Sequence, residues 1–471
     1  MSQPILPDHH LEKRMGPWSA TALNMSNMIG VGPFITLPAL MATLGGPQSM
    51  LGWLAALVIT LPDALVWSEL GAAMPASGGT YKWLRAGYGA EKWGRLMAFL
   101  FIWQLIISGP MEIGSGIIGF AQYLDYLWPG VAADNLQNPR GIAVVLVLMG
   151  VVVLMLYRRI AHIAKLTIAI WLGVLFTVGA VLFTGAVKFD AARAFDFPPN
   201  AFGFSWGFLM GLAQGARIGI YDYLGYYDIC YVGDEVRDPG RTIPRSVIGS
   251  LVVVAVIYAG INLSIIGVVP WREFTPVAGQ PEPDFAKYVA SICMERAWGR
   301  PVAMVFTVML LWTATACIFA LLLGYSRIPY AAARDGTFFS FFDKLHPTKH
   351  FPHRALLLLA GLSAACSFLS LGTVIETLVV LRILVQFIGQ IGALILLRKL
   401  KPDMPRPYKV WLYPLPLLVA GAGWLFVFCT SQEKVWYALA SLTLGCAAYF
   451  MWAGATRRWP FQQDGADDSR A

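Results

Sequence analysis

Two glycines and a proline interrupt the first long apolar stretch of this chain. From Met15 to Pro62 there is no Asp, Glu, Lys or Arg, and Gly30-Val31-Gly32-Pro33 lies near the middle of that stretch. An uncharged stretch of this length fits the hydrocarbon of a bilayer. Glycine loosens a helix and proline lacks the backbone N–H, so we expect the helix to break here. Freed backbone groups are tolerated at membrane depth where they line a cavity, so the break is a candidate substrate site.

The composition excludes a soluble protein. Hydrophobic residues make up 57% of the 471 residues and charged residues only 13%, which is too little polar surface to cover a water-soluble domain. We expect an all-α integral membrane protein with twelve transmembrane helices. Their expected positions are residues 18–44, 48–75, 96–124, 141–157, 166–187, 203–232, 246–270, 301–326, 355–375, 377–397, 410–430 and 435–456.

The basic residues predict the orientation in the membrane. Lys and Arg in short loops stay on the cytoplasmic side, and an N-terminus inside places most of them there. We therefore expect a multi-pass protein of the plasma (cell inner) membrane with cytoplasmic ends at 1–17 and 457–471. The net charge of +8 then reflects topology and attraction to anionic lipid, and we expect no nucleic-acid partner. The six cysteines are scattered without metal-ligand spacing, so we expect no metal site, and nothing indicates a cofactor.

The sixth apolar stretch carries charges that a membrane helix rarely contains. Arg217, Asp222 and Asp228 lie within it, and each costs ~2.5–3.5 kcal/mol at the centre of a spanning helix. Such groups are expected to face a polar interior. Gly225 and the aromatic residues around it predict an unwound segment at Tyr223–Tyr226, whose carbonyl groups would attract a cation. The alternative is that Arg217 and Asp222 only neutralise each other or another span.

Glu112 adds a third acid inside an apolar stretch. It lies in Gly109-Pro110-Met111-Glu112-Ile113-Gly114, where Gly and Pro allow close helix approach. A buried carboxyl group with a nearby Arg can carry a proton at physiological pH. Glu112 is therefore a candidate coupling residue. The open alternative is a structural ion pair with Arg217 or Arg382.

Several segments together resemble the amino acid-polyamine-organocation superfamily of permeases. The most specific one is Tyr231–Arg245, which follows the sixth stretch. The similarity covers most of the chain in the order of that family. The other matching segments are Ile29–Phe34, Ser68–Gly71, Pro75–Gly79, Leu397–Lys399, Pro402–Asp403 and Arg406–Tyr408.

The resemblance implies a 5+5 inverted-repeat transporter fold with broken helices 1 and 6. The first repeat would span 18–187 (helices 1–5), the second 203–397 (helices 6–10), and two further C-terminal helices 410–456. It also implies that the helix 1 segment binds a substrate carboxylate through its backbone, while Tyr221–Tyr226 offer carbonyl groups to the amine. The expected substrate-binding residues are Ile29, Gly30, Val31, Gly32, Phe34, Glu112, Tyr221, Asp222, Tyr223, Leu224, Gly225 and Tyr226. The expected coupling or gating residues are Glu112, Asp228 and Glu235.

Two departures from the family pattern affect this interpretation. Pro33 removes one N–H from the anion-binding turn. No charge lies between Lys165 and Lys188, so a lysine-based proton relay is not carried over.

The acids inside the apolar stretches are similar to those of the polyamine-transporting branch of the superfamily. They are Glu112, Asp222 and Asp228.

The function expected from the sequence is secondary active transport of amino acids by alternating access, as symport or exchange. The expected coupling ion is a proton, and the sequence leaves an accessory subunit open. The alternative is a polyamine or other organic-cation transporter, followed by a channel or nutrient sensor. The sequence shows no nucleotide-binding or catalytic motif, so we expect no enzyme.

Overall fold

The computed structural model describes residues 15–76, 78–157, 160–275, 283–349 and 351–461. Within these residues the chain is helical and forms no β-strand. Residues 1–14 and 462–471, which make up most of the expected cytoplasmic ends, lie outside the described residues. The helices are α1 (Pro17–Met28), α2 (Gly32–Ile35), α3 (Leu37–Leu44), α4 (Leu51–Ala73), α5 (Thr80–Gly87), α6 (Trp93–Leu127), α7 (Pro139–Leu156), α8 (Ile160–Lys188), α9 (Ala191–Ala194), α10 (Trp206–Tyr223), α11 (Pro239–Val268), α12 (Trp271–Phe274), α13 (Val289–Trp298), α14 (Arg300–Arg334), α15 (His353–Cys366), α16 (Leu371–Arg382), α17 (Gly389–Leu400), α18 (Leu415–Cys429) and α19 (Lys434–Ala455).

Most of the expected spans are helices long and apolar enough to cross a membrane. Eight helices in the described residues meet this criterion, and the bent pair Pro17–Ile35 and Leu37–Leu44 makes up to nine. Three expected spans contain helices that are shorter or more polar than this criterion requires. They are 203–232 with α10, 355–375 with α15 and 410–430 with α18. The protein is thus a multi-pass membrane protein. The count of twelve and the repeat arrangement stay predictions.

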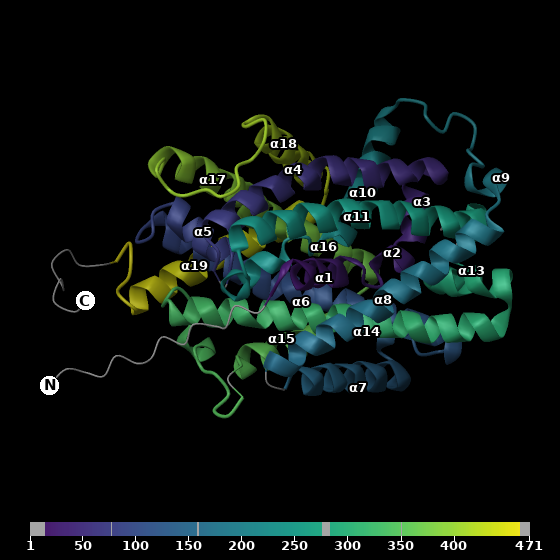
Figure 1. Ribbon diagram of the computed structural model, residues 1–471, viewed down its shortest axis with the longest axis horizontal. Helices are drawn as coiled ribbons and strands as arrows, with labels where there is room; N and C mark the ends of the chain where they lie inside the picture. The colour runs from purple at the N-terminus through teal and green to yellow at the C-terminus, as the bar shows by residue number, and fades with distance from the viewer. Residues whose placement is uncertain (1–14, 77, 158–159, 276–282, 350, 462–471) are drawn as a thin grey trace.

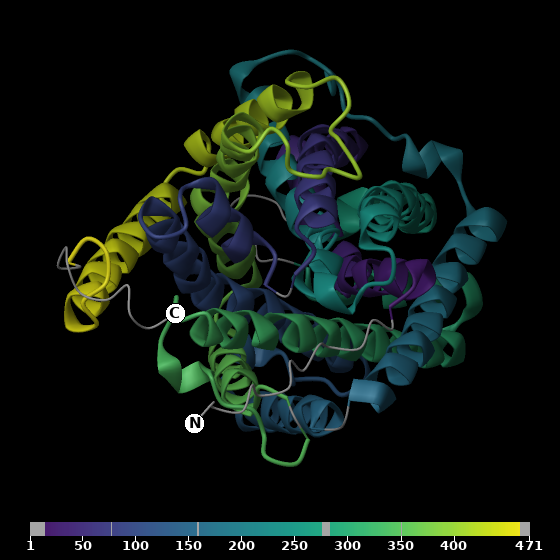
Figure 2. The same cartoon turned by 60° about the vertical axis from the view of Figure 1, so that its left-hand side comes forward.

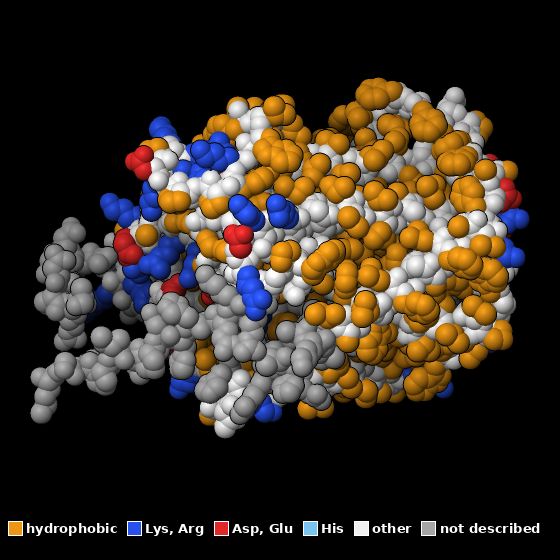
Figure 3. Space-filling view, viewed as in Figure 1, with side chains coloured by type: hydrophobic (Ala, Val, Ile, Leu, Met, Phe, Trp, Pro, Cys, Tyr) orange, Lys and Arg blue, Asp and Glu red, His pale blue; other side chains and the backbone are white. Residues whose placement is uncertain are grey.

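Most of the charged side chains on the face shown in Figure 3 lie at one end of an elongated helical bundle. In Figure 1 the long helices α4, α6, α11 and α14 follow the long axis, and the last helix, α19, lies at one end of it. Figure 3 shows Lys and Arg gathered at that end and hydrophobic side chains over most of the remaining face. The last helix, α19, lies at the edge of the bundle (Figure 2) and packs against α6 and α16.

The predicted break in the first span is confirmed. Helix α1 ends at Met28, residues 29–31 are not helical, and α2 starts at Gly32. Pro33 lies in the first turn of α2, where a missing N–H breaks no helical hydrogen bond. A bend of 62° separates the segment Pro17–Ile35 from α3.

The predicted unwinding in the sixth span is also confirmed. Helix α10 ends at Tyr223, and Leu224 is extended with a ψ of 140°. Gly225 follows with a φ of +106°, a conformation that favours glycine. Short 3₁₀ turns continue the chain at Asp228–Tyr231 and Gly233–Glu235. The stretch 203–232 is therefore an α-helix only as far as Tyr223.

Glu69 joins α4 to the end of α17 and the loop after it. Its carboxylate accepts hydrogen bonds from the Arg398 guanidinium, with Nε at 2.8 Å from Oε1, and from the Val410 backbone N–H at 2.7 Å. The Nε atom of Arg406 lies 3.5 Å from Oε1. Because Glu69 is fully buried, these partners replace the water that the carboxylate loses.

We expect Glu69→Ala to lower the free energy of unfolding by ~3–5 kcal/mol, because it leaves Arg398 and Arg406 without their carboxylate partner. Denaturant unfolding of the purified protein, followed by tryptophan fluorescence, measures the change. The control is Asp196→Ala, which removes an exposed ion pair with Arg272 and should lower the free energy of unfolding far less, because solvent screens that pair. Equal losses for the two variants would contradict the structural role of Glu69.

Candidate functional site

Two asparagines of α1 hold the unwound segment that follows α10. The Asn24 side-chain amide donates to the backbone carbonyl of Tyr226 at 2.6 Å, and its Oδ1 accepts from the Ile229 N–H at 2.9 Å. One turn later, the Asn27 amide donates to the Asp228 carboxylate. These bonds satisfy backbone groups that neither helix satisfies internally, so the two interrupted spans meet at one level.

Asp222, in the last turn of α10, faces the break in α1. Its Oδ2 accepts from the Thr36 hydroxyl at 2.7 Å, and its Oδ1 lies against the α-carbon of Gly32, where a β-carbon would collide with it. The Tyr258 hydroxyl of α11 is within hydrogen-bonding distance of the Met28 carbonyl and lies 2.9 Å from the Asp222 carbonyl. A carboxylate oxygen thus lies at the point where the sequence predicted a substrate carboxylate.

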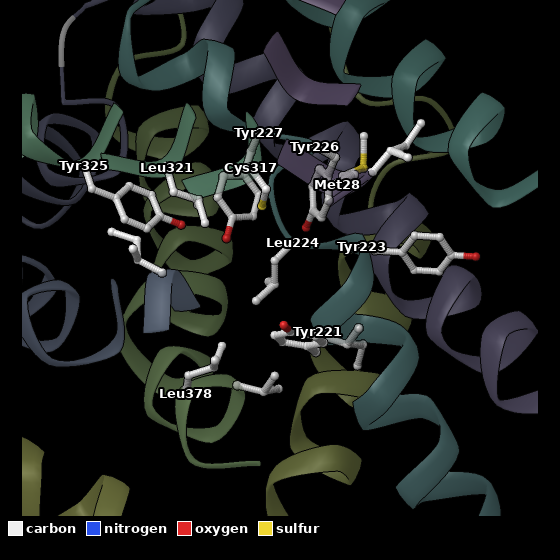
Figure 4. Packing of buried hydrophobic residues seen from close by; sticks show 14 of the residues in the cluster. Met28, Tyr221, Tyr223, Leu224, Tyr226, Tyr227, Cys317, Leu321, Tyr325 and Leu378 are labelled. Carbon is white, nitrogen blue, oxygen red and sulfur yellow. The ribbon is translucent and has the colours of Figure 1, made fainter. Parts of the chain in front are cut away.

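A small cavity lies between the two breaks. Its volume is about 30 Å³, enough for about two water-sized groups, so a larger ligand needs side chains to move. In Figure 4, Leu224 lies between Tyr221 and Cys317, while Tyr223 points away from them. The cavity is lined by Asn27, Met28, Gly30, Val31, Gly32, Glu112, Ser115, Gly116, Tyr221, Asp222, Leu224, Cys317 and Leu321.

Glu112, which lines the cavity, forms an ion pair with Arg382. Its Oε2 lies 2.7 Å from Nη2 of Arg382, which is fully buried at the end of α16, and it accepts from the Tyr325 hydroxyl at 2.6 Å. The same guanidinium donates to Ser108 at 3.0 Å and to Tyr227 at 3.3 Å. Of the two partners left open by the sequence, the structure selects Arg382.

Arg217 does not neutralise Asp222. Its guanidinium donates to the Thr430 carbonyl at the end of α18, at 3.0 Å. Within the described residues, Asp222 and Asp228 form no ion pair, and Oδ1 of each is buried without a hydrogen-bond partner. The site therefore holds two acids that lack a positive partner there, beside one acid that has Arg382.

The structure brings together about half of the residues expected to bind substrate. Tyr226 instead donates to Asp63 at 2.5 Å, and Tyr223 stacks on Tyr258. Glu235 lies near Arg327, with 3.4 Å between Oε1 and Nη2. The expected residues that line the cavity are Gly30, Val31, Gly32, Glu112, Tyr221, Asp222 and Leu224, and those that do not are Ile29, Phe34, Tyr223, Gly225 and Tyr226.

Sequence reasoning missed several lining residues. Asn27 carried a usable signal, because Asn24 and Asn27 are polar residues three apart, on one face of an otherwise apolar helix. Cys317 and Leu321 of α14 carried no signal, because their types are common in any membrane helix. Their place in the site depends on how α14 packs beside α1.

Comparison with known proteins identifies the family. The sequence profile described as amino acid permease matches residues 15–449. The branched-chain amino acid permease BcaP of Bacillus subtilis (strain 168) is 23% identical over 94% of this chain and 93% of its own length. The methylthioribose transporter of the same organism is 24% identical over 94% of each chain. An uncharacterized transporter of Mycobacterium tuberculosis (strain ATCC 25618 / H37Rv) is 30% identical over 76% of this chain and 74% of its own.

The matched family and the relatives, together with the helical membrane fold, define a membrane permease rather than an enzyme. The chain belongs to the amino acid permease family, within the amino acid-polyamine-organocation superfamily that its motifs resembled. The family assignment made from the sequence is confirmed.

We expect Gly32→Val to lower uptake by at least about tenfold, which corresponds to ~1.4 kcal/mol of lost binding. The new side chain would meet the Asp222 carboxylate directly. Uptake per folded molecule in membrane vesicles is the measurement, with surface-exposed yield quantified in parallel. Gly421→Val in α18, where a β-carbon meets no atom within 4 Å, is the matched control and should transport normally. Normal uptake by the Gly32 variant would remove the break from the transport site.

Proposed function

We propose that this protein is a secondary active transporter that moves amino acids across the plasma membrane by alternating access. The observation that carries the proposal is the small cavity between two interrupted helices, lined by backbone at the α1 break and by side chains of α6, α10 and α14. Membership of the amino acid permease family supports amino acids as substrates, as does the similarity to a branched-chain amino acid permease.

We propose that the fold is a 5+5 inverted repeat of twelve spans with both chain ends cytoplasmic. The two breaks support the repeat, because each falls in the first span of one proposed half, 18–187 or 203–397. The concentration of Lys and Arg at the end of the bundle where α19 lies supports the orientation (Figure 3).

We propose a proton as the coupling ion, with Glu112 and Asp228 as coupling groups and Glu235 as a gating group. The buried Asp228 oxygen without a partner in the described residues supports this role, because a proton would satisfy it. The contact of Glu235 with Arg327 joins the segment after α10 to α14 and supports gating. We also propose that the residues expected at the two breaks, in the first and sixth spans, contact the substrate.

We expect purified full-length protein in proteoliposomes to accumulate radiolabelled leucine when the outside is made acidic. A protonophore should abolish the accumulation, because it collapses the gradient that drives it. Liposomes without protein give the background, and serine and lysine are tested in parallel. Uptake that ignores the pH gradient would contradict proton coupling, and no uptake or exchange of any amino acid would contradict the proposed function.

We expect Glu112→Gln to lower transport and flatten its pH dependence, because an amide cannot carry the coupled proton. The single change also leaves Arg382 buried without its anion, which costs ~3–5 kcal/mol of stability. The double variant Glu112→Gln with Arg382→Gln removes both charges and separates the two effects. A flat pH profile in the double variant supports a coupling role, whereas a restored wild-type profile would show that the pair is only structural.

A further inference from the structure

The chain between α9 and α10 exposes a group of aromatic side chains. Their exposed fractions are 51% for Phe195, 40% for Phe197, 59% for Phe202, 81% for Phe204 and 75% for Trp206. Single exposed apolar residues are common on any protein surface, but a group of them in one short segment marks an interaction surface. We call residues 195–206 the aromatic loop.

Hydrogen bonds fix both ends of the aromatic loop. The Asp196 carbonyl accepts from Nε1 of Trp271 at 3.0 Å, and the Asp196 carboxylate accepts from Nε of Arg272 at 2.9 Å. At the other end, the Ser205 hydroxyl accepts from the Phe208 N–H at 3.1 Å and caps α10. The exposed rings therefore belong to a segment with a defined path, and this segment sets where α10 begins.

The aromatic loop continues the apolar outer side of α8. Phe183 and Val187, in the last two turns of this spanning helix, are exposed. The ring of Phe189, directly after the helix, lies 6.3 Å from the ring of Phe195 between centroids. Because the outward apolar side chains of a spanning helix contact lipid, the loop adjoins a lipid-facing surface.

The position of the loop agrees with contact to lipid. In Figure 1 the chain between α9 and α10 runs along one side of the bundle, and Figure 2 also places it at the outer edge. Figure 3 shows hydrophobic side chains over this part of the face, far from the end where Lys and Arg gather. From Phe197 to Ala216 the sequence holds no Asp, Glu, Lys or Arg. A partner protein would find no charge here to fix its orientation, whereas a lipid surface needs none.

Charged residues mark the level at which the chain leaves the hydrocarbon. Lys188 is the last residue of α8, and Asp190 forms a half-exposed ion pair with Arg193, with 3.1 Å between Oδ2 and Nε. These groups require water or lipid headgroups around them. Because Phe195 follows two residues later, the aromatic loop lies next to the level where aromatic side chains gather at a membrane surface.

We propose that the aromatic loop inserts into the interface of the lipid bilayer and anchors the start of α10 there. Its rings lie at the boundary between headgroups and acyl chains, while Asp190, Arg193 and Asp196 stay in contact with water. The partner is a lipid surface rather than a second protein. Helix α10 then has one end at the membrane interface and the other, Tyr223, at the break beside the cavity. This anchoring is independent of which substrate the protein carries.

Spin labels at single cysteines test the position of the loop. Full-length protein in lipid nanodiscs carries Phe202→Cys or Phe204→Cys. In the background, the cysteines that are not buried, Cys366, Cys429 and Cys446, are replaced by serine. Power saturation compares collisions of the label with oxygen, which concentrates in lipid, and with a water-soluble nickel complex. We expect collisions with oxygen to dominate by about twofold or more at both positions, because the rings lie below the headgroups.

Two further labels calibrate this measurement. Phe176→Cys, on the exposed side of the spanning helix α8, should collide mainly with oxygen, and Ala133→Cys, in the exposed turn after α6, should collide mainly with the nickel complex. A loop label that behaves like the label at Ala133 would place the loop in water and overturn the proposal. Few collisions with either reagent would show that protein covers the loop, from a second copy or another chain, and would overturn it too.

The double variant Phe202→Ser with Phe204→Ser tests the anchoring. We expect it to lower the melting temperature in nanodiscs by at least a few degrees, because the serines remove apolar area that lipid covers. The matched control is Ala201→Ser, which leaves the rings in place and should unfold like the wild type. In a loop surrounded by water, the loss of the two rings would leave the melting temperature unchanged or raise it, and either result would overturn the anchoring.

Discussion

The hydrogen bonds between α1 and the segment after α10 fix the geometry of the site. Membrane helices satisfy their own backbone groups, and an interruption exposes groups that hydrocarbon cannot satisfy. Asn24 supplies one donor and one acceptor to the interrupted chain at Tyr226 and Ile229. The first span therefore completes the break after α10, while the Tyr258 hydroxyl of α11 contacts the Met28 carbonyl at the α1 break. The cavity exists because both interruptions fall at the same level.

Arg382 joins several segments around the site and compensates the charge of Glu112. It contacts Glu112 and Ser108 of α6, Tyr227 after α10 and Tyr325 of α14. A π-helical turn, Ile383–Ile388, begins directly after it and separates α16 from α17. Such turns occur often at functional sites. One guanidinium thus joins four segments and compensates one acid of the site.

The buried acids fall into two groups by their partners. Asp63 accepts from Trp67, Tyr226 and Trp424, and Glu69 pairs with two arginines, so both are satisfied and hold helices together. Asp222 and Asp228 each keep an oxygen without a partner in the described residues. A satisfied acid contributes to packing, whereas an unsatisfied acid beside a cavity is suited to a ligand or a proton.

The sequence by itself determined the membrane class, the family and both interruptions. These depend on local properties: uncharged stretches, the glycines and proline at 30–33, and the acids at 112, 222 and 228. The tertiary structure decided that Arg382 pairs with Glu112 and that Arg217 does not pair with Asp222, because ion pairing depends on which helices are neighbours. It also turned Tyr223 and Tyr226 away from the cavity and placed Cys317 at its wall. Those orientations follow from where α10 ends and how α14 packs, which the local residue pattern does not encode.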